Sequence, residues 1–144
     1  RDVCPRNFIA TRDCTGLKLF DFGLSLPDEP AFHQPGNRTG TPFYMAPEIV
    51  RRRKTDHRVD IFAMGVSFYQ LLTFELPWPS NDASGLAALS HDTLAPTPIL
   101  EYKPKLHPKL VEAIMLCMSV SPNDRPKSTD QFLQMITDVD SAMV

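Results

Sequence analysis

Residues 58–74 constrain the fold more than any other segment, because apolar side chains cover every face of the helix that they predict. A helix that is apolar all round must be buried on all sides. Pro77 and Pro79 are expected to end it, with the Trp78 ring plugging the core at that end. The alternative for Trp78 is a place on a peptide-docking surface. The apolar residues of the segment are Val59, Ile61, Phe62, Met64, Val66, Phe68, Tyr69, Leu71 and Leu72.

The region before this helix predicts a hairpin and a long loop. Residues 8–10 and 17–20 are short apolar strands, and residues 12–16 between them have turn chemistry. Residues 24–43 contain several prolines and glycines and few apolar side chains. Loops this long within compact domains are usually functional or disordered.

The region after the helix predicts three shorter helices. The first is a short one near residues 83–90, and prolines then impose an extended path over 96–108. The second follows Pro108, and the third starts at Ser128 with the spacing of a capping box to Gln131. Their expected buried faces hold Leu110, Ala113, Ile114 and Cys117, and Phe132, Met135, Ile136 and Val139. The fold class is therefore mainly α, as a helical bundle with one small hairpin.

Composition narrows the class of protein. The chain has 144 residues, about one domain, and a net charge of −2, which does not point to nucleic acid or anionic membranes. Its three cysteines form no CxxC pair, so we expect no disulfide framework and a reducing, cytoplasmic compartment. Its four histidines have no metal-ligand spacing, so we assign none of them to a metal. No apolar run approaches the ~18 residues of a membrane span, although a parent protein could be anchored. Because the first residue is Arg1, we interpret the chain as part of a longer protein.

Three polar residues flank the hairpin in a way that suits phosphate chemistry. Asn7 precedes the first strand and Asp21 follows the second, so the hairpin brings both side chains to one end. Asp2 lies five residues before Asn7 and is expected beside them. Carboxylate and carbonyl oxygens are the ligands that Mg²⁺ prefers. Phosphoryl transfer needs the nucleophile positioned and the phosphate charge neutralised, mostly by Mg²⁺.

These residues belong to motifs that resemble the eukaryotic-type protein kinase family. RDVCPRN at 1–7 is similar to the catalytic loop HRDxKxxN, and DFG occupies 21–23. TGTPFYMAPE at 39–48 resembles the substrate-docking segment, and residues 60–65 resemble the start of the large central helix. Arg125 matches the arginine that pairs with the APE glutamate. The resemblance covers the whole chain as the C-terminal lobe of a kinase domain, with an activation segment at 21–48 and a helical subdomain at 49–144.

The resemblance implies a role for each matching residue. Asp2 would accept or orient the substrate hydroxyl, Asn7 and Asp21 would hold Mg²⁺, and Ile9 would pack under the adenine of ATP. Thr41 would contact the catalytic loop, as in serine/threonine kinases, so protein serine and threonine hydroxyls are the expected substrates. Structural support would come from Asp60 beneath the catalytic loop and from a buried ion pair between Glu48 and Arg125.

The chain also departs from the family pattern. It contains no Gly-rich phosphate loop, no VAIK-type lysine and no partner glutamate, so the N-terminal lobe is expected in a longer parent chain. Cys4 stands where serine/threonine kinases usually have lysine. The position of Arg6 resembles that of the arginine in the catalytic loop of tyrosine kinases. Arg6 would then supply the positive charge that Cys4 lacks, unless it is only a solvated loop residue. Cys4 could alternatively be a reactive thiol.

Two further questions stay open from the sequence. Arg1 beside Asp2 suggests a loop ordered by phosphorylation, for which Thr39 is the candidate acceptor; the alternative is a loop ordered without phosphate. The main functional hypothesis is a kinase represented by its C-terminal lobe. The alternatives are a pseudokinase or scaffold lobe that binds proteins, and a truncated product without activity. The basic run at 51–54 is interpreted as a solvated loop.

Overall fold

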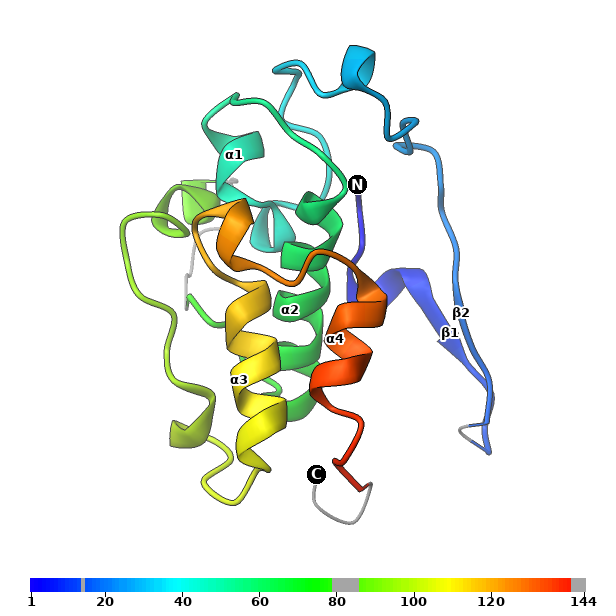
Figure 1. Cartoon of the computed structure of the whole chain (residues 1–144), viewed down its shortest axis with the longest axis vertical. Coiled ribbons are helices and arrows are strands. Elements are labelled where there is room, and N and C mark those ends of the chain that lie inside the picture. Colours follow the sequence, from blue (N-terminus) through cyan, green and yellow to red (C-terminus); the bar gives the residue numbers. More distant parts are fainter. Residues whose placement is uncertain (14, 79–85, 141–144) are drawn as a thin grey trace.

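A central helix organises the domain. The computed structural model describes residues 1–13, 15–78 and 86–140. Helix α2 (Arg58–Thr73) lies at the centre, with α3 (Pro108–Cys117) packed along it and α4 (Thr129–Met135) beside them (Figure 1). The short helix α1 (Pro47–Val50) lies at one end of the bundle. The described residues contain two strands, so the expectation of a mainly helical fold with a small hairpin is confirmed.

Helix α2 is buried on most of its surface, as its apolar sequence predicts. Phe62, Val66 and Tyr69 are fully covered. The expectation that every face is buried is wrong at Leu71, whose side chain is 54% exposed because it lies on the helix side that no described element covers. The helix ends at Thr73, one residue before the predicted end: Phe74 takes a left-handed conformation (φ 63°), and its N–H donates to the Gln70 carbonyl.

Trp78 closes the core at this end of α2. Its indole is 5% exposed and stacks on Phe62 at a centroid distance of 5.8 Å. The indole N–H donates to the Leu94 carbonyl at 2.9 Å. The core interpretation of Trp78 is therefore confirmed.

Close contact between α2 and α3 depends on Gly65. A Cβ at this position would lie 2.5 Å from Cβ of Cys117 and 3.1 Å from Cγ of Met118. Atoms of one helix that approach the backbone of another so closely leave no room for any side chain.

Replacing Gly65 by alanine is expected to lower the free energy of unfolding by about 2 kcal/mol. Overpacking costs up to about 3 kcal/mol, and alanine recovers at most about 1 kcal/mol through its helix propensity. Chemical denaturation measures the change. Gly36→Ala is the control, because no atom lies within 4 Å of a Cβ there. Equal effects of the two substitutions would contradict the packing argument.

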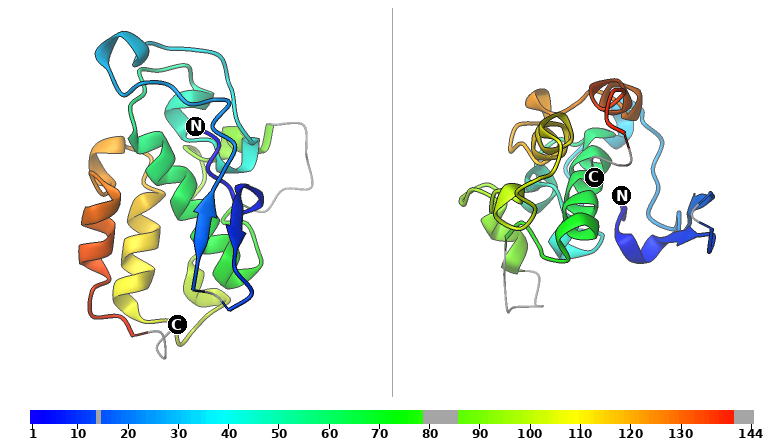
Figure 2. Two further views of the ribbon diagram at one scale, coloured as in Figure 1. Left: turned by 90° about the vertical axis from the view of Figure 1, so that its right-hand side faces the viewer. Right: turned by 90° about the horizontal axis from the view of Figure 1, so that it is seen from below.

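The hairpin projects from the bundle (Figures 1 and 2). Strand β1 (Phe8–Ala10) pairs antiparallel with β2 (Leu17–Leu19), with Phe8 opposite Leu19. The predicted second strand extends one residue too far, although the Phe20 N–H still donates to the Asn7 carbonyl at 2.9 Å. This bond fixes the end of the hairpin at which Asn7 and Asp21 lie. Residue 14 of the predicted turn lies outside the described residues.

Short 3₁₀ helices occupy much of the remaining chain. The helix expected near 83–90 is such a turn at Leu86–Ser90, and residues 83–85 lie outside the described part. The path expected to be extended over 96–108 is interrupted at Ile99–Glu101, because the buried Ile99 side chain anchors a turn there. The others are Pro5–Asn7, Pro30–Phe32, Pro42–Tyr44 and Pro122–Asp124.

Helix α4 begins as its sequence predicts. Ser128 is the N-cap, and its Oγ accepts from the Gln131 N–H at 3.1 Å. In a capping box the side chain of Gln131 would accept from the N–H of Ser128. Here Gln131 Oε1 accepts instead from the N–H of the preceding residue, Lys127, at 2.7 Å. Phe132 is buried, and Met135, Ile136 and Val139 pack against the core. The predicted apolar face is therefore the one that the helix buries.

Candidate active site

Asp2 is the centre of the most connected polar cluster near the hairpin. Its Oδ1 accepts two hydrogen bonds from Thr41, one from the backbone N–H at 2.8 Å and one from the hydroxyl at 2.7 Å. The side-chain amide of Asn7 donates to the Asp2 carbonyl at 2.8 Å and to Asp2 Oδ2 at 3.3 Å. The turn Pro5–Asn7 bends the chain back, which brings Asn7 against Asp2 and buries its side chain.

The hydrogen bonds to Asp2 favour its charged form. Burial alone would raise the pKa of this carboxyl group, but the bonds from Thr41 and Asn7 and the charge of Arg6 outweigh it and lower the pKa. Asp2 is therefore an ionised carboxylate at neutral pH, with Oδ2 less occupied than Oδ1. An ionised carboxylate is the form that can accept a proton or orient a hydroxyl.

Arg6 lies next to this carboxylate on the solvent side. Its Nη2 donates to Thr41 Oγ1 at 2.7 Å and lies 3.6 Å from Asp2 Oδ2. Cys4 is completely buried, with its Sγ 4.0 Å from Thr41 Oγ1. The structure thus places a positive charge from Arg6, and none from Cys4, beside Asp2. Burial of Cys4 also speaks against its interpretation as an accessible reactive thiol.

Asp21 and Ile9 lie on the exposed side of the same region. Asp21 follows β2 with a left-handed backbone (φ 64°), and its Oδ1 is 3.4 Å from the Gly23 N–H. No hydrogen bond joins it to Asp2 or Asn7 among the described residues. Ile9 projects from β1 with 59% of its surface exposed. The Asp21 carboxylate is therefore open to solvent at the same end of the hairpin as Asn7.

Replacing Thr41 by valine should raise the pKa of Asp2. Valine keeps the shape and the backbone N–H but removes the hydroxyl that donates to Oδ1. A carboxylate with a lowered pKa contributes stability above its ordinary pKa and loses it as the pH falls, so the variant should lose less stability in acid. The carboxyl ¹³C shift of Asp2, followed against pH, measures the pKa. Thr41→Ser keeps the hydroxyl and should change little; an unchanged pKa in the valine variant would contradict the assignment.

Glu48, the last residue of the segment 39–48, forms a buried ion pair with Arg125. Two guanidinium nitrogens of Arg125 donate to the two carboxylate oxygens of Glu48 at 2.7 and 2.8 Å. The remaining N–H groups of Arg125 donate to three backbone carbonyls, so all five are used. The guanidinium also lies 5.0 Å from the Phe62 ring centroid. The pair connects residues 47–50 to the turn before α4.

Asp60 and Arg1 meet at the start of α2. Asp60 Oδ1 lies 2.9 Å from the Arg1 backbone nitrogen, which places the carboxylate directly against the residue before Asp2. Arg1 Nε is buried and has no hydrogen-bond partner among the described residues. Arg1 and Thr39 line the same small cavity beside Asp2. Arg1 and the candidate phosphate acceptor therefore lie near each other.

Gly40 belongs to the 39–48 motif, but no role was predicted for it from the sequence. Its φ is 108°, and a Cβ here would lie 2.7 Å from the Arg1 carbonyl oxygen. Only glycine lets the loop approach the backbone of Arg1 closely enough for Thr41 to reach Asp2. The sequence feature that could have indicated this role is the glycine between Thr39 and Thr41.

Arg38 is a second residue with no predicted role. Its Nε donates a hydrogen bond to the Val50 carbonyl at 2.8 Å.

Comparisons with known proteins identify the family. The protein kinase domain model matches residues 1–136, so the chain belongs to the protein kinase family. It is 36% identical to "Serine/threonine-protein kinase pkn3" of Myxococcus xanthus over 97% of this chain and 27% of that protein. It is 30% identical to "Serine/threonine-protein kinase A" of Synechocystis over 98% of this chain and 28% of that protein. "Tyrosine-protein kinase MasK" of Myxococcus xanthus is 37% identical over 92% of this chain and 20% of that protein.

The chain spans about a quarter of the length of these relatives. Within its described residues, no helix is both long and apolar enough to cross a bilayer.

Proposed function

We propose that this chain supplies the catalytic part of a serine/threonine protein kinase, which transfers the γ-phosphate of ATP to serine and threonine hydroxyls of proteins. The observation that carries the proposal is the contact of Thr41 with Asp2. Two donors from the docking segment hold one oxygen of an ionised carboxylate, and the other oxygen faces Arg6 and Asn7. A substrate held by residues 39–48 would therefore present its hydroxyl beside Asp2.

Asp2 acts in this proposal by positioning the acceptor hydroxyl and accepting its proton. Thr41 fixes the rotation of the carboxylate through Oδ1, which leaves Oδ2 as the oxygen for the substrate. Asp60 supports the segment from beneath through Arg1. A fixed carboxylate lowers the barrier mainly by holding the reactants in line.

Asn7 and Asp21 fit a magnesium ion bound with ATP. The Asn7 amide nitrogen is used by Asp2, and its Oδ1 accepts no hydrogen bond among the described residues. Asp21 adds an exposed carboxylate at the same end of the hairpin. Two hard oxygens suit Mg²⁺, which completes its shell with phosphates and water. The bound ion would neutralise charge on the phosphates, and Ile9 would offer an apolar contact to the adenine.

Arg6 takes over the charge that Cys4 lacks in this proposal. Its guanidinium is joined to Thr41 and Asp2, at the place where the transferring phosphate would meet the acceptor hydroxyl. A guanidinium binds phosphate oxygens well because it offers several donors in one plane. The free thiols Cys4 and Cys117 are compatible with the reducing cytoplasm in which we expect the protein to act.

Acceptor preference tests the proposal. The full-length protein is incubated with ATP, Mg²⁺ and peptides that differ only in a serine, threonine or tyrosine acceptor. We expect phosphate on serine and threonine and little on tyrosine, since Thr41 occupies the docking position. Preference for tyrosine would overturn the proposal in its serine/threonine form.

The 144 residues alone are expected to transfer no measurable phosphate, because they contain no Gly-rich loop or VAIK-type lysine to hold ATP. Radiolabel incorporation by the isolated chain that disappears in Asp2→Asn would contradict this expectation.

A further inference from the structure

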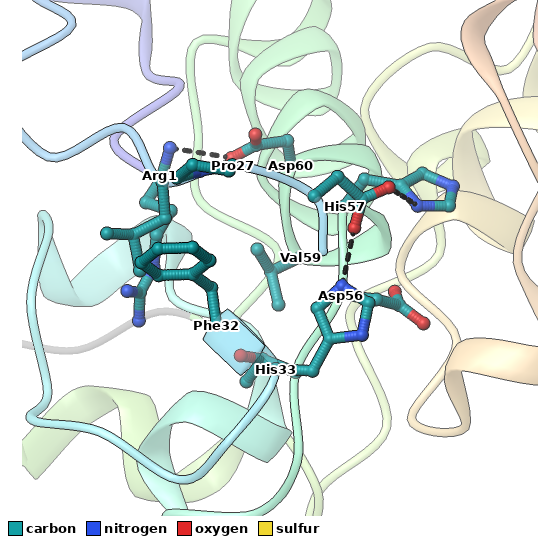
Figure 3. A pocket seen from close by; sticks show the side chains of 11 residues that line it. Arg1, Pro27, Phe32, His33, Asp56, His57, Val59 and Asp60 are labelled. Carbon is teal, nitrogen blue, oxygen red and sulfur yellow. Dashed lines mark hydrogen bonds and ion pairs between the residues drawn. The ribbon is translucent and has the colours of Figure 1, made fainter. Parts of the chain in front are cut away.

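One carboxylate in the loop 24–43 bridges two histidines. Asp28 Oδ1 lies 2.7 Å from His33 Nε2, and Asp28 Oδ2 lies 3.0 Å from His57 Nδ1. His33 belongs to the same loop, whereas His57 is the N-cap residue of α2. The two histidines lie on one side of a small pocket whose other side includes Arg1 and Phe32 (Figure 3). The contact to His57 therefore ties the loop to the helical core.

His57 makes a second contact through its other ring nitrogen, Nε2. Nε2 lies 2.7 Å from the backbone carbonyl oxygen of Lys127. A carbonyl oxygen and an ionised carboxylate can only accept hydrogen bonds. Nε2 must therefore carry a hydrogen to bond the Lys127 carbonyl, whereas the contact of Nδ1 with Asp28 is an ion pair only when the imidazole is protonated.

Charged groups lie around His57 on several sides. Asp28 faces it from the loop, and Asp56 precedes it in the chain, although Arg58 pairs with Asp56 at 2.6 Å. His33 is the second imidazole at Asp28, and Lys127 contributes its carbonyl oxygen. The other charged groups that line the pocket are Arg1 and Asp60, and Asp60 Oδ1 lies 2.9 Å from the Arg1 backbone nitrogen. Asp28 is the carboxylate that forms an ion pair with the His57 ring.

We propose that Asp28 and His57 form a pH-sensitive latch that holds the loop 24–43 to the start of α2 in mild acid and releases it as the pH rises above neutral. The backbone supports the same attachment, because the Thr55 N–H donates to the His33 carbonyl at 2.9 Å. Arg38, farther along the loop, is held separately at Val50. Loss of the latch should therefore loosen residues 28–33 more than residues 38–41.

The pH window follows from the two partners. The hydrogen bond from His33 and the charges of His57 and His33 lower the pKa of Asp28, so its carboxylate persists in acid below the ordinary range. Histidine side chains change charge between about pH 5 and 8. The latch is thus complete in mild acid, weakens as the imidazolium loses a proton, and fails at low pH only when Asp28 is protonated.

Imidazole NMR of the full-length protein tests the protonation directly. Long-range ¹H–¹⁵N spectra at about pH 6 should show both ring nitrogens of His57 protonated, and one proton should be lost as the pH rises. His91 is an internal reference: it is buried, Nδ1 contacts the Met45 carbonyl at 2.8 Å, and burial lowers its pKa, so it should stay neutral. A neutral His57 ring at about pH 6 would overturn the proposal.

Chymotrypsin cleavage after Phe32 tests the latch itself. His57→Gln cannot carry the charge, so its cleavage should be roughly fivefold faster than wild type at about pH 6 and equal at about pH 8. Comparison at each pH cancels the protease's own pH dependence. His57→Arg, a permanent cation, should protect Phe32 at both pH values, and circular dichroism confirms that the variants fold. His33→Gln, within the loop, should have the smaller effect. If the cleavage rate of His57→Gln relative to wild type does not change with pH, the latch is refuted.

Discussion

Replacing Asp2 by asparagine is expected to reduce kcat for protein phosphorylation by about 10²–10⁴-fold in the full-length protein. Asparagine still accepts the two hydrogen bonds from Thr41 through its oxygen, so the local structure should be kept. It has no charge and cannot take a proton from the substrate hydroxyl. Initial rates with a serine peptide, at saturating ATP and Mg²⁺, measure the effect.

Asp13→Asn is the control for this experiment. Asp13 lies at the opposite end of the hairpin, where it accepts a hydrogen bond from Thr11, and it is exposed. The substitution removes the same charge at the far end of the hairpin and should leave kcat within about twofold, as surface changes away from a site usually do. An Asp2→Asn variant as active as Asp13→Asn would exclude Asp2 from the chemistry.

Replacing Glu48 by glutamine should lower the free energy of unfolding by about 3–5 kcal/mol, because it leaves the Arg125 charge buried without its counterion. Arg125 is 3% exposed and Glu48 5%, so water cannot replace the lost partner. The loss is large because α1, α2 and the turn before α4 all meet at this guanidinium. Urea denaturation followed by tryptophan fluorescence measures it, with Trp78 as the intrinsic probe.

Asp138→Asn provides the matched comparison. Asp138 pairs with Lys109, but both side chains are at least half exposed. Exposed pairs contribute about 0–1 kcal/mol, so this variant should be nearly neutral. A loss for Glu48→Gln no larger than that for Asp138→Asn would show that the buried pair contributes little.

Local sequence information predicted the hairpin and the core helix well. The strands at 8–10 and 17–20 and the helix from 58 are encoded by short apolar patterns, which do not depend on distant contacts. Asp2 and Asn7 also lie together for a local reason, since the turn Pro5–Asn7 folds Asn7 back onto Asp2. Thr41 was expected at the catalytic loop through the family resemblance, and the structure places it there.

Features that depend on tertiary contacts could not be read from local patterns. Leu71 belongs to the apolar pattern of α2, but burial depends on which elements pack against each face, and none of the described elements covers it. The turn at Ile99 arises because the core takes up that side chain. Asp28 and His57 are 29 positions apart in segments without shared periodicity, so their contact follows only from how the loop folds back.

Paramagnetic relaxation by Mn²⁺–ATP tests the central claim most directly, namely that one end of the hairpin holds the metal beside Asp2. In the full-length protein, substoichiometric Mn²⁺ with ATP should broaden the side-chain amide of Asn7 and the backbone amide of Gly23. The amide of Gly16, at the far turn of the hairpin, should broaden less than either of them. Broadening of Gly16 without Asn7, or no broadening of either Asn7 or Gly23, would contradict the account.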